Sequence, residues 1–376
     1  MTDKIARFLA ARRPATPCLV VDLDAVEENY RALAEALPTA EIYYAMKANP
    51  ARPIVERLDR LGSRFDTASI YEIEQCRALA IAPERMAYGS TVKKERDIGR
   101  AHACGVGLYA FDSEAELAKL ARAAPGARVL CRIATDGAGA DWPLSQKFGC
   151  DIDMAIDLLQ RAGALGLDPH GLSFHVGSQQ RDVAQWDIAI GRSAMVFTAL
   201  SRRGVDLETI NLGGGFPARY RQDAPPVERC GEAICAAMTR HFGNNLPRMM
   251  IEPGRCIPGD AGIVQTEIVL ISRKSRGDAK RWIYLDVGRF GGLPEVMGEA
   301  IQYRLRTGRD GGPTGPVAIA GPTCDEVDML YEDAGYELPL ALEIGDRIEI
   351  LSAGAYTASY ASIGFNGFPP LDEYYI

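Results

Sequence analysis

The sequence predicts an α/β fold, in which a (β/α)8 TIM-type barrel is followed by a mostly-β C-terminal domain. Two observations lead to this prediction. Short apolar runs alternate with segments of helical spacing between residues 24 and 258, and the alternation stops where glycine and proline begin to separate strand-like runs. At roughly 100–200 residues per domain, a chain of 376 residues has room for about two domains.

Eight short apolar runs supply the predicted barrel strands. They mostly lack alternation of apolar and polar residues, as expected for parallel strands that are buried on both faces. The runs are Ile42–Met46, Arg64–Thr67, Arg85–Tyr88, Gly107–Phe111, Arg128–Ile133, Leu172–Val176, Thr209–Leu212 and Arg248–Ile251. The intervals carry helical spacing, as at Ile54, Leu58 and Leu61, and a helix over Asp24–Leu37 precedes the first run.

An open, doubly wound sheet is the alternative to a closed barrel. Such a sheet normally carries a glycine-rich phosphate-binding turn after its first strand. Here Lys47 follows the first strand, and the three glycines Gly213–Gly215 follow the seventh. We therefore expect a closed barrel over residues 24–258.

The remaining residues have the pattern of a β domain. Strand-like runs over Ile263–Ser272, Trp282–Val287, Val317–Ala320 and Arg347–Leu351 are separated by glycine and proline turns. A further strand-like run, Pro17–Leu23, precedes the barrel. We expect residues 1–23 and 259–376 to form one β-sandwich or β-barrel-like domain that the N-terminal strand completes.

Composition narrows the class of protein. The net charge of −8 and a pI near 5.3 argue against a nucleic acid partner, because binding phosphates needs a basic surface. No apolar run approaches the roughly 20 residues that span a bilayer, and the N-terminus lacks the apolar core of a secretory signal, so no membrane association is expected. The nine cysteines form no C-x-x-C pair, which favours reduced thiols, a cytoplasmic location and no metal site.

Polar residues follow several of the predicted barrel strands at the point where each strand ends. Lys47, Asp66 and His175 end the first, second and sixth strands, and Gly213–Gly215 and Glu252–Arg255 follow the seventh and eighth. The active site of such a barrel lies at the carboxyl ends of its strands. The residues that could take part in a reaction therefore lie where this fold has its active site.

A phosphate site and a lysine amine together suggest pyridoxal phosphate. The loops after strands seven and eight usually bind phosphate, and here they hold three glycines and Arg255. Lys47 is suited to form a Schiff base with the aldehyde of that cofactor. Each residue also has a simpler interpretation: a tight turn for the glycines, a solvated rim lysine for Lys47 and a hydrogen-bonded core histidine for His175.

Motifs along nearly the whole chain, from about residue 15 to 370, carry a family resemblance. The sequence resembles the pyridoxal phosphate-dependent, fold type III (alanine racemase-like) decarboxylases of basic amino acids, with the ornithine decarboxylases most similar. The motifs are Tyr44-Ala-Met-Lys-Ala-Asn49, Phe65-Asp-Thr-Ala-Ser69, Ser173-Phe-His-Val-Gly-Ser178, Asn211-Leu-Gly-Gly-Gly-Phe216, Glu252-Pro-Gly-Arg255, Gly321-Pro-Thr-Cys-Asp325 and Gly354-Ala-Tyr-Thr357.

The resemblance implies a role for each matching residue. Lys47 would carry the cofactor as a Schiff base, Glu252 would pair with the pyridine nitrogen, and Cys324 would protonate the product. The implied catalytic residues are Lys47, Cys324, His175 and Glu252. The implied cofactor-binding residues are Lys47, Asp66, Arg132, His175, Ser178, Gly213, Gly214, Gly215, Glu252, Gly254, Arg255 and Tyr356, with Glu72 as further support.

The resemblance also implies a substrate site and a partner. The implied substrate-binding residues are Asp325, Glu299, Glu295 and Phe290, of which Phe290 replaces the tyrosine of animal enzymes. In the family Cys324 and Asp325 come from the partner subunit, so a head-to-tail homodimer with shared active sites is expected. Lys147 and Asp328 match an ion pair across that interface.

We therefore expect decarboxylation of L-ornithine to putrescine, an entry step of polyamine synthesis. Decarboxylation of lysine to cadaverine, or of both substrates, is the first alternative. A diaminopimelate decarboxylase is less favoured, because that family has glutamate in place of Asp325 and needs a cation for the distal carboxylate, whereas Asp325 and Glu299 suit a distal ammonium. A non-catalytic pyridoxal phosphate-binding protein is also less favoured, because it would lack the second domain. A pseudoenzyme paralogue should lack the lysine or the cofactor contacts, and these are present.

Overall fold

The computed structural model describes residues 1–144 and 146–376. The chain divides into two compact units. The barrel unit comprises Glu27–Pro217 and Ala224–Arg255, and the sheet unit comprises Met1–Val26, Ala218–Asp223 and Cys256–Ile376.

The barrel unit is built on eight parallel strands that close on themselves in the order β10-β11-β2-β3-β4-β5-β6-β8. The strands are β2 (Ala40–Ala45), β3 (Arg64–Thr67), β4 (Met86–Tyr88), β5 (Leu108–Phe111), β6 (Arg128–Arg132), β8 (Asp168–Ser173), β10 (Thr209–Asn211) and β11 (Arg248–Ile251). Each of the eight predicted runs overlaps one of these strands, so the predicted barrel is confirmed.

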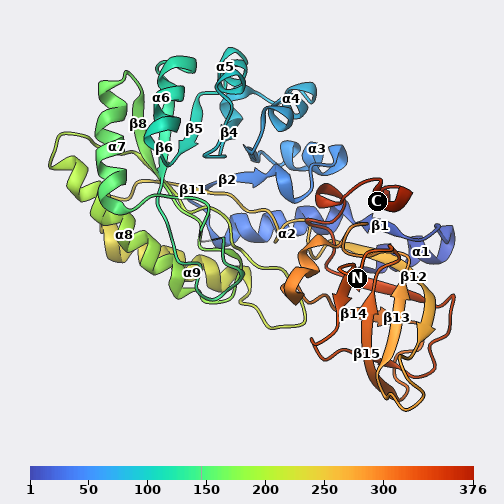
Figure 1. The fold of residues 1–376 in the computed structure, drawn as a ribbon. Helices are drawn as coiled ribbons and strands as arrows, with labels where there is room; N and C mark the ends of the chain where they lie inside the picture. Colours follow the sequence, from blue (N-terminus) through green and yellow to red (C-terminus); the bar gives the residue numbers. More distant parts are fainter. Residues whose placement is uncertain (145) are drawn as a thin grey trace. The chain divides into compact units, whose positions relative to one another are not determined.

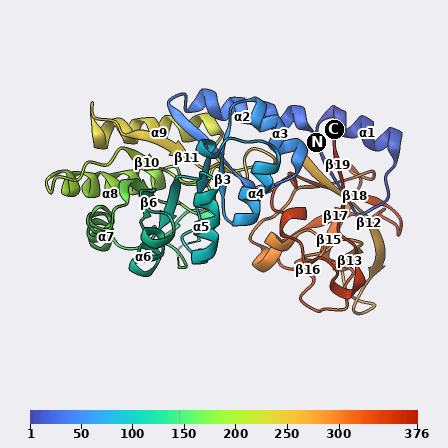
Figure 2. The same cartoon turned by 90° about the horizontal axis from the view of Figure 1, so that it is seen from above.

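Helices lie on the outside of the barrel strands (Figures 1 and 2). They are α2 (Leu23–Ala36), α3 (Arg52–Arg60), α4 (Ile70–Ala78), α5 (Glu95–Ala103), α6 (Glu114–Ala123), α7 (Ile152–Ala164), α8 (Ala184–Ser201) and α9 (Val227–Phe242). Three begin at side chains that accept a backbone N–H from the first turn. Ser69 accepts from Glu72, Ser113 from Glu116 and Asp151 from Met154.

Apolar side chains fill part of the barrel interior. Tyr43, Ala87, Leu108, Leu130 and Met250, from five strands, form one buried cluster. This packed layer is the usual filling of such a barrel, which leaves the strand ends for function.

A two-stranded antiparallel sheet, which the sequence did not predict, lies beyond β6 and β8. It pairs β7 (Ala140–Trp142) with β9 (Ser178–Gln180). Strands of three residues are too short to show a periodic pattern of apolar residues. The structure was therefore needed to show that the segment after β6 pairs with the segment after His175.

The sheet unit contains nine strands, drawn mainly in orange and red in Figure 1. They are β1 (Cys18–Val21), β12 (Gly262–Ser272), β13 (Arg281–Leu285), β14 (Leu305–Thr307), β15 (Thr314–Ala320), β16 (Met329–Tyr331), β17 (Glu337–Pro339), β18 (Arg347–Leu351) and β19 (Asp372–Tyr375). The main order is β14-β18-β12-β13-β15-β16. The N-terminal strand β1 pairs antiparallel with β12 and parallel with β19.

Helix α1 (Asp3–Arg12) is a feature of the sheet unit that the sequence did not predict. Thr2 accepts the N–H of Ile5 at its start, and Ile5 and Leu9 pack on Cys18, Val20 and Ile263. Short 3-10 helices complete the chain: η1 (Met46–Ala48), η2 (Pro83–Arg85), η3 (Pro294–Glu299), η4 (Ala358–Tyr360) and η5 (Phe365–Gly367). Within residues 1–144 and 146–376, no helix combines the length and apolar character needed to cross a membrane.

Candidate active site

Closure of the barrel places three of the predicted site residues at neighbouring strand ends. Lys47 lies in η1 directly after β2, Asp66 lies in β3 and Glu252 follows β11. Strand β2 pairs with β3 on one side and with β11 on the other. The N–H of Ala45 donates to the carbonyl oxygen of Pro253 at 2.9 Å, which fastens the Lys47 segment to the Glu252 segment.

Lys47 and Asp66 form an ion pair, with 3.7 Å between Nζ and Oδ2. The lysine side chain is 48% exposed and can reach a ligand, whereas the aspartate side chain is 4% exposed. Burial raises the pKa of Asp66, and the charges of Lys47 and Arg132 oppose that rise. A Cβ on Gly89 would lie 2.0 Å from Oδ1 of Asp66, so this carboxylate needs a glycine beside it.

Glu252 is held by Asn211, a residue whose role the sequence analysis missed. The Asn211 amide Nδ2 donates to Oε1 of Glu252 at 2.5 Å, and its Oδ1 accepts the N–H of Gly213 at 2.9 Å. The N–H of Glu252 donates to the carbonyl of Gly213 at 2.8 Å. Burial raises the pKa of Glu252 to about 7; the charge of Asp66 adds to the rise, and Lys47 opposes it.

His175 follows β8 with a fixed ring orientation. Its Nδ1 accepts the N–H of Gly177 at 3.0 Å, so the neutral ring carries its proton on Nε2. Thr135 Oγ1 donates to the His175 carbonyl at 2.6 Å, a further contact that the sequence analysis missed. Burial, with smaller contributions from Arg132 and Lys47, holds the pKa of His175 well below its usual value. The imidazole is therefore neutral at pH 7, as suits stacking on an aromatic ligand.

The loop after β10 requires glycine at all three positions. Gly213 and Gly215 have φ of 65° and 101°, values that other residues adopt only with strain. A Cβ on Gly214 would lie 2.7 Å from the Glu252 carbonyl oxygen and 3.2 Å from His175 Nε2. The loop therefore packs closely against Glu252 and His175, and its backbone N–H groups are suited to binding an anion.

Arg255 and Ser178 lie beside this loop in the barrel unit. The buried Arg255 guanidinium donates from Nη2 and Nε to Ser178 Oγ, at 3.0 and 3.3 Å. The N–H of Gln180 donates to the Gly215 carbonyl at 2.9 Å, which joins the Ser178 strand to the glycine loop. A guanidinium, a hydroxyl and glycine N–H groups form the donor set that a phosphate requires.

Two further predicted residues surround Lys47. The Arg132 guanidinium lies 4.9 Å from the centre of the Phe148 ring, and burial lowers its pKa despite the opposing charges of Glu252 and Asp112. Glu72 in α4 accepts the N–H of Ala68 at 2.6 Å, and burial raises its pKa to about 7. Gly254 occupies the turn between Glu252 and Arg255.

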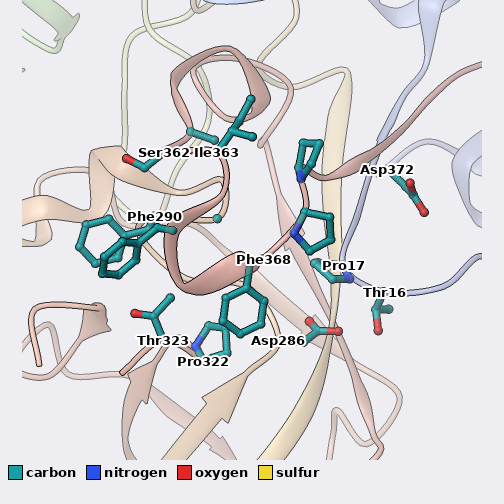
Figure 3. A pocket seen from close by; sticks show the side chains of 15 residues that line it. Thr16, Pro17, Asp286, Phe290, Pro322, Thr323, Ser362, Ile363, Phe368 and Asp372 are labelled. Atoms are coloured by element: carbon teal, nitrogen blue, oxygen red, sulfur yellow. The ribbon is translucent and has the colours of Figure 1, made fainter. Parts of the chain in front are cut away.

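The remaining predicted residues belong to the sheet unit. Cys324 has an exposed thiol on the loop between β15 and β16, and its N–H donates to Asn366 Oδ1 at 2.8 Å. The Phe290 and Phe365 rings lie 4.7 Å apart. They line a cavity of about 130 Å³ next to this loop, together with Asp286, Thr323 and Phe368 (Figure 3). Tyr356 also belongs to this unit, with a φ of 55°.

The predicted substrate acids differ in what they already bind. Oε1 of Glu299 accepts the N–H groups of Glu332 and Asp333 at 2.6 and 2.8 Å, so this carboxylate caps a loop of its own unit. Glu295 is buried in η3. Among the described residues, the Asp325 carboxylate accepts a single, local N–H, that of Val327 at 3.0 Å, and Asp325 is half-buried beside Cys324.

The comparisons with known proteins agree with this arrangement. A family model described as "pyridoxal-dependent decarboxylase, pyridoxal binding domain" matches residues 23–259. The chain therefore belongs to the pyridoxal-dependent decarboxylases. The predicted family is confirmed, and so is pyridoxal phosphate as the cofactor. These matched residues contain the barrel unit and most of the site described above.

Relatives and solved structures narrow the type of pyridoxal-dependent decarboxylase. A lysine/ornithine decarboxylase of Selenomonas ruminantium is 36% identical to this chain, and the match covers 98% of this chain and 91% of the relative. An ornithine decarboxylase of Schizosaccharomyces pombe is 33% identical, and that match covers 97% of this chain and 85% of the relative. A crystal structure of SrLDC with PLP and cadaverine (TM-score 0.88, 35% identity) covers 99% of this chain and 93% of its own. An arginine decarboxylase of Paramecium bursaria Chlorella virus bound to agmatine (TM-score 0.91, 27% identity) covers 100% of both. The chain is thus a decarboxylase of basic amino acids.

The residues of the barrel unit fit pyridoxal phosphate. Lys47 supplies an accessible amine, Glu252 a buried carboxyl for the pyridine nitrogen and His175 a neutral ring. Oδ1 of Asp66 is buried with no hydrogen-bond partner among the described residues, so a polar atom is left for a ligand. Ser178, Arg255 and the glycine loop provide donors for the phosphate.

Replacing Gly214 by alanine tests the glycine loop of the decarboxylase. The added Cβ must displace the Glu252 carbonyl or the His175 ring, and overpacking of this kind costs about 1–3 kcal/mol. We expect pyridoxal phosphate affinity to fall by about tenfold or more, measured by titrating the cofactor-free protein and following cofactor absorbance. Gly163→Ala in α7, where a Cβ meets nothing within 4 Å, is the matched control. Wild-type affinity in Gly214→Ala would contradict the close packing of the loop.

The raised pKa of Glu252 predicts a pH-dependent stability of the cofactor-free decarboxylase. Folded Glu252, with a pKa of about 7, retains a proton that the unfolded chain releases near 4.5. The free energy of unfolding therefore falls as pH rises from about 4.5 to about 7. In Glu252→Gln the free energy of unfolding should therefore fall less steeply with pH over this window, by up to about 1.4 kcal/mol per pH unit.

Urea unfolding of the cofactor-free proteins between pH 5.5 and 8 measures this effect. Glu72 has a pKa shift of the same direction and stays in both proteins, so the comparison isolates Glu252. Glu28→Gln, at an exposed position, is the control that should follow the wild type. Parallel pH profiles for wild type and Glu252→Gln would show that Glu252 is ionised in the folded protein.

Proposed function

We propose that this enzyme decarboxylates L-ornithine to putrescine in the cytoplasm, a reaction of polyamine synthesis. The observation that carries the proposal is Asp325, an acid next to the exposed Cys324 thiol. In the part of the chain that the structure describes, the Asp325 carboxylate accepts one local N–H and no other hydrogen bond. A carboxylate in this place suits the distal ammonium of a diamino acid. The names of the relatives in Selenomonas and Schizosaccharomyces support the same substrate class.

The barrel unit supplies the binding chemistry of the proposed reaction. When bound, pyridoxal phosphate supplies the carbonyl group that condenses with amines and the ring that accepts the electron pair left by CO2. Lys47 would bind that carbonyl with its amine, and Asp66 orients the lysine from 3.7 Å. Glu252 would hold the proton of the pyridine nitrogen, with Asn211 fixing its Oε1. Ser178 and Arg255, with the glycine loop, would bind the phosphate.

The sheet unit supplies the groups for the substrate. Cys324 would deliver a proton to the α-carbon of the product, and Asp325 would bind its distal ammonium. Phe290, whose ring packs at a tilt against that of Phe365, would form an apolar wall for the methylene chain. Glu299 and Glu295 rank behind Asp325, because Glu299 already caps two N–H groups and Glu295 is buried.

A substrate panel with a matched pair of variants tests this proposal. Purified enzyme with pyridoxal phosphate is given ornithine, lysine, arginine or diaminopimelate, and CO2 and diamine are measured; ornithine should give the highest kcat/KM. Asp325→Asn removes a charge-assisted hydrogen bond, so the KM for ornithine should rise by about 10–100-fold. Glu326→Gln, the exposed neighbouring acid, is the control. A higher kcat/KM for lysine would instead favour the cadaverine-forming alternative.

We propose that the active form is a head-to-tail homodimer with shared active sites. The sheet unit exposes apolar side chains around the Cys324 loop, with Val327 50% and Ile363 70% exposed. Tyr360 and Phe368 are also exposed there, at 53% and 38%. A surface of this kind marks an interface, and a second copy of the chain is its proposed occupant.

A complementation experiment tests the shared sites. Lys47→Ala and Cys324→Ala should each lose most activity, because each removes a proposed catalytic group from both sites of a dimer. Random mixing gives half mixed dimers with one intact site each, so about one quarter of wild-type activity should return. Native mass spectrometry, which resolves the two variant subunits by mass, confirms that exchange has occurred. No recovery from exchanged dimers would show that both groups act within one subunit.

A further inference from the structure

The carboxylate of Asp328 joins the two segments that carry Cys324 and Phe290. Asp328 is only 2% exposed. Its Oδ2 accepts the N–H and the hydroxyl of Thr323, at 3.1 and 2.7 Å, and its Oδ1 accepts the N–H of Arg289 at 2.7 Å. Thr323 immediately precedes Cys324, and Arg289 immediately precedes Phe290. One buried side chain therefore fixes the backbone on both sides of the proposed substrate pocket.

Two glycines show that the surrounding backbone is built around this carboxylate. A Cβ on Gly288 would lie 2.2 Å from Oδ1 of Asp328, and a Cβ on Gly321 would lie 2.4 Å from Oδ2. The Asp328 carboxylate therefore fills the space that glycine leaves at both positions.

Backbone hydrogen bonds close the same loop at both ends. The N–H of Gly321 donates to the carbonyl of Asp328 at 2.7 Å, and the N–H of Asp328 donates to the carbonyl of Asp325 at 3.0 Å. At the tip, the N–H of Cys324 donates to Asn366. The thiol is exposed, while the residues on either side of it are held by Asp328.

We propose that Asp328 is a positioning residue, which holds Cys324 at the place from which it delivers a proton and holds Phe290 against the same substrate. This inference rests on the proposed function, in which Cys324 is the proton donor. It differs from the role that the family resemblance implies, an ion pair between Asp328 and Lys147 across the dimer interface. The three hydrogen bonds of the carboxylate come from its own subunit.

Three isosteric or near-isosteric variants separate the two roles. Thr323→Val removes the hydroxyl that donates to Asp328, Asp328→Asn changes the acceptor itself, and Lys147→Met removes the cation of the implied interface pair. Thr307→Val is the matched control, because Thr307 donates its N–H and hydroxyl to Asp310 in the same manner elsewhere in the sheet unit. Thr323→Val also keeps the test usable if Asp328→Asn fails to fold.

Two measurements on the dimeric holoenzyme are compared among these variants. The first is the ratio of diamine formed to CO2 released, which falls when the proton is not delivered to the α-carbon. The second is amide hydrogen exchange of residues 288–290 and 321–328, which reports the hydrogen bonds directly. Thr323→Val and Asp328→Asn should lower the ratio below unity, lower kcat by about tenfold or more with little change of KM, and speed exchange in both segments. Lys147→Met and Thr307→Val should keep the wild-type ratio and exchange.

Cys324→Ala provides the reference that keeps the two proposals apart. A unit ratio in Cys324→Ala would overturn the proton-donor role and the positioning role that rests on it. A low ratio there, with wild-type ratio and exchange in Thr323→Val and Asp328→Asn, would overturn the positioning role alone. A Lys147→Met enzyme that matches Asp328→Asn, while Thr323→Val matches the wild type, would show that Asp328 acts through the partner subunit.

Discussion

The pairing of the last barrel strand with the first is the interaction on which the site depends. Ile42 of β2 lies opposite Ile251 of β11, and the next contact along, from the Ala45 N–H to the Pro253 carbonyl, continues that register to the strand ends. Without closure, Lys47 and Glu252 would stand at opposite edges of an open sheet. With it, the amine, the acid and the glycine loop share one end of the barrel, and each strand fixes one component.

Bringing these ionisable side chains together at one end of the barrel costs electrostatic free energy, and the surrounding residues reduce that cost. Asp66 is buried and Glu72 and Glu252 are half-buried, and desolvation raises the pKa of all three carboxyls. Lys47 opposes the rise at each of them, and Arg132 does so at Asp66 and Glu252. Groups of this kind are rarely buried without a functional reason, since ionised side chains in a poorly solvated site are expensive. The polar contacts that support them, from Asn211 to Glu252 and from Ala68 to Glu72, follow from the same requirement.

The sequence predicted the parts of the structure that repeat or that lie next to a repeating element. Buried strands are apolar throughout, so all eight barrel runs were recognisable, and their ends located Lys47, Asp66, His175 and Glu252. The short strands β7 and β9 have no period to recognise, and α1 buries only Ile5 and Leu9. Gly89, Asn211 and Thr135 could not be assigned because their partners come from other strands. Such contacts depend on register, which periodicity does not give.

The hydrogen bonds of Asp328 and Glu299 could not be predicted from the sequence for a related reason, and they bear on the proposed substrate choice. Backbone N–H groups of the same unit donate hydrogen bonds to each carboxylate, so each carboxylate already stabilises a loop of that unit. Asp325 differs, because the one local hydrogen bond that its carboxylate accepts from residues 1–144 and 146–376 leaves acceptor capacity for an ammonium group. In the proposed mechanism the barrel residues bind the cofactor and Cys324 of the sheet unit delivers the proton, and the length of diamino acid accepted would depend on where the loop held by Asp328 places Asp325. Under this proposal, a change of preference between ornithine and lysine would need only a small shift of that loop, with Lys47, Glu252 and the glycine loop unaltered.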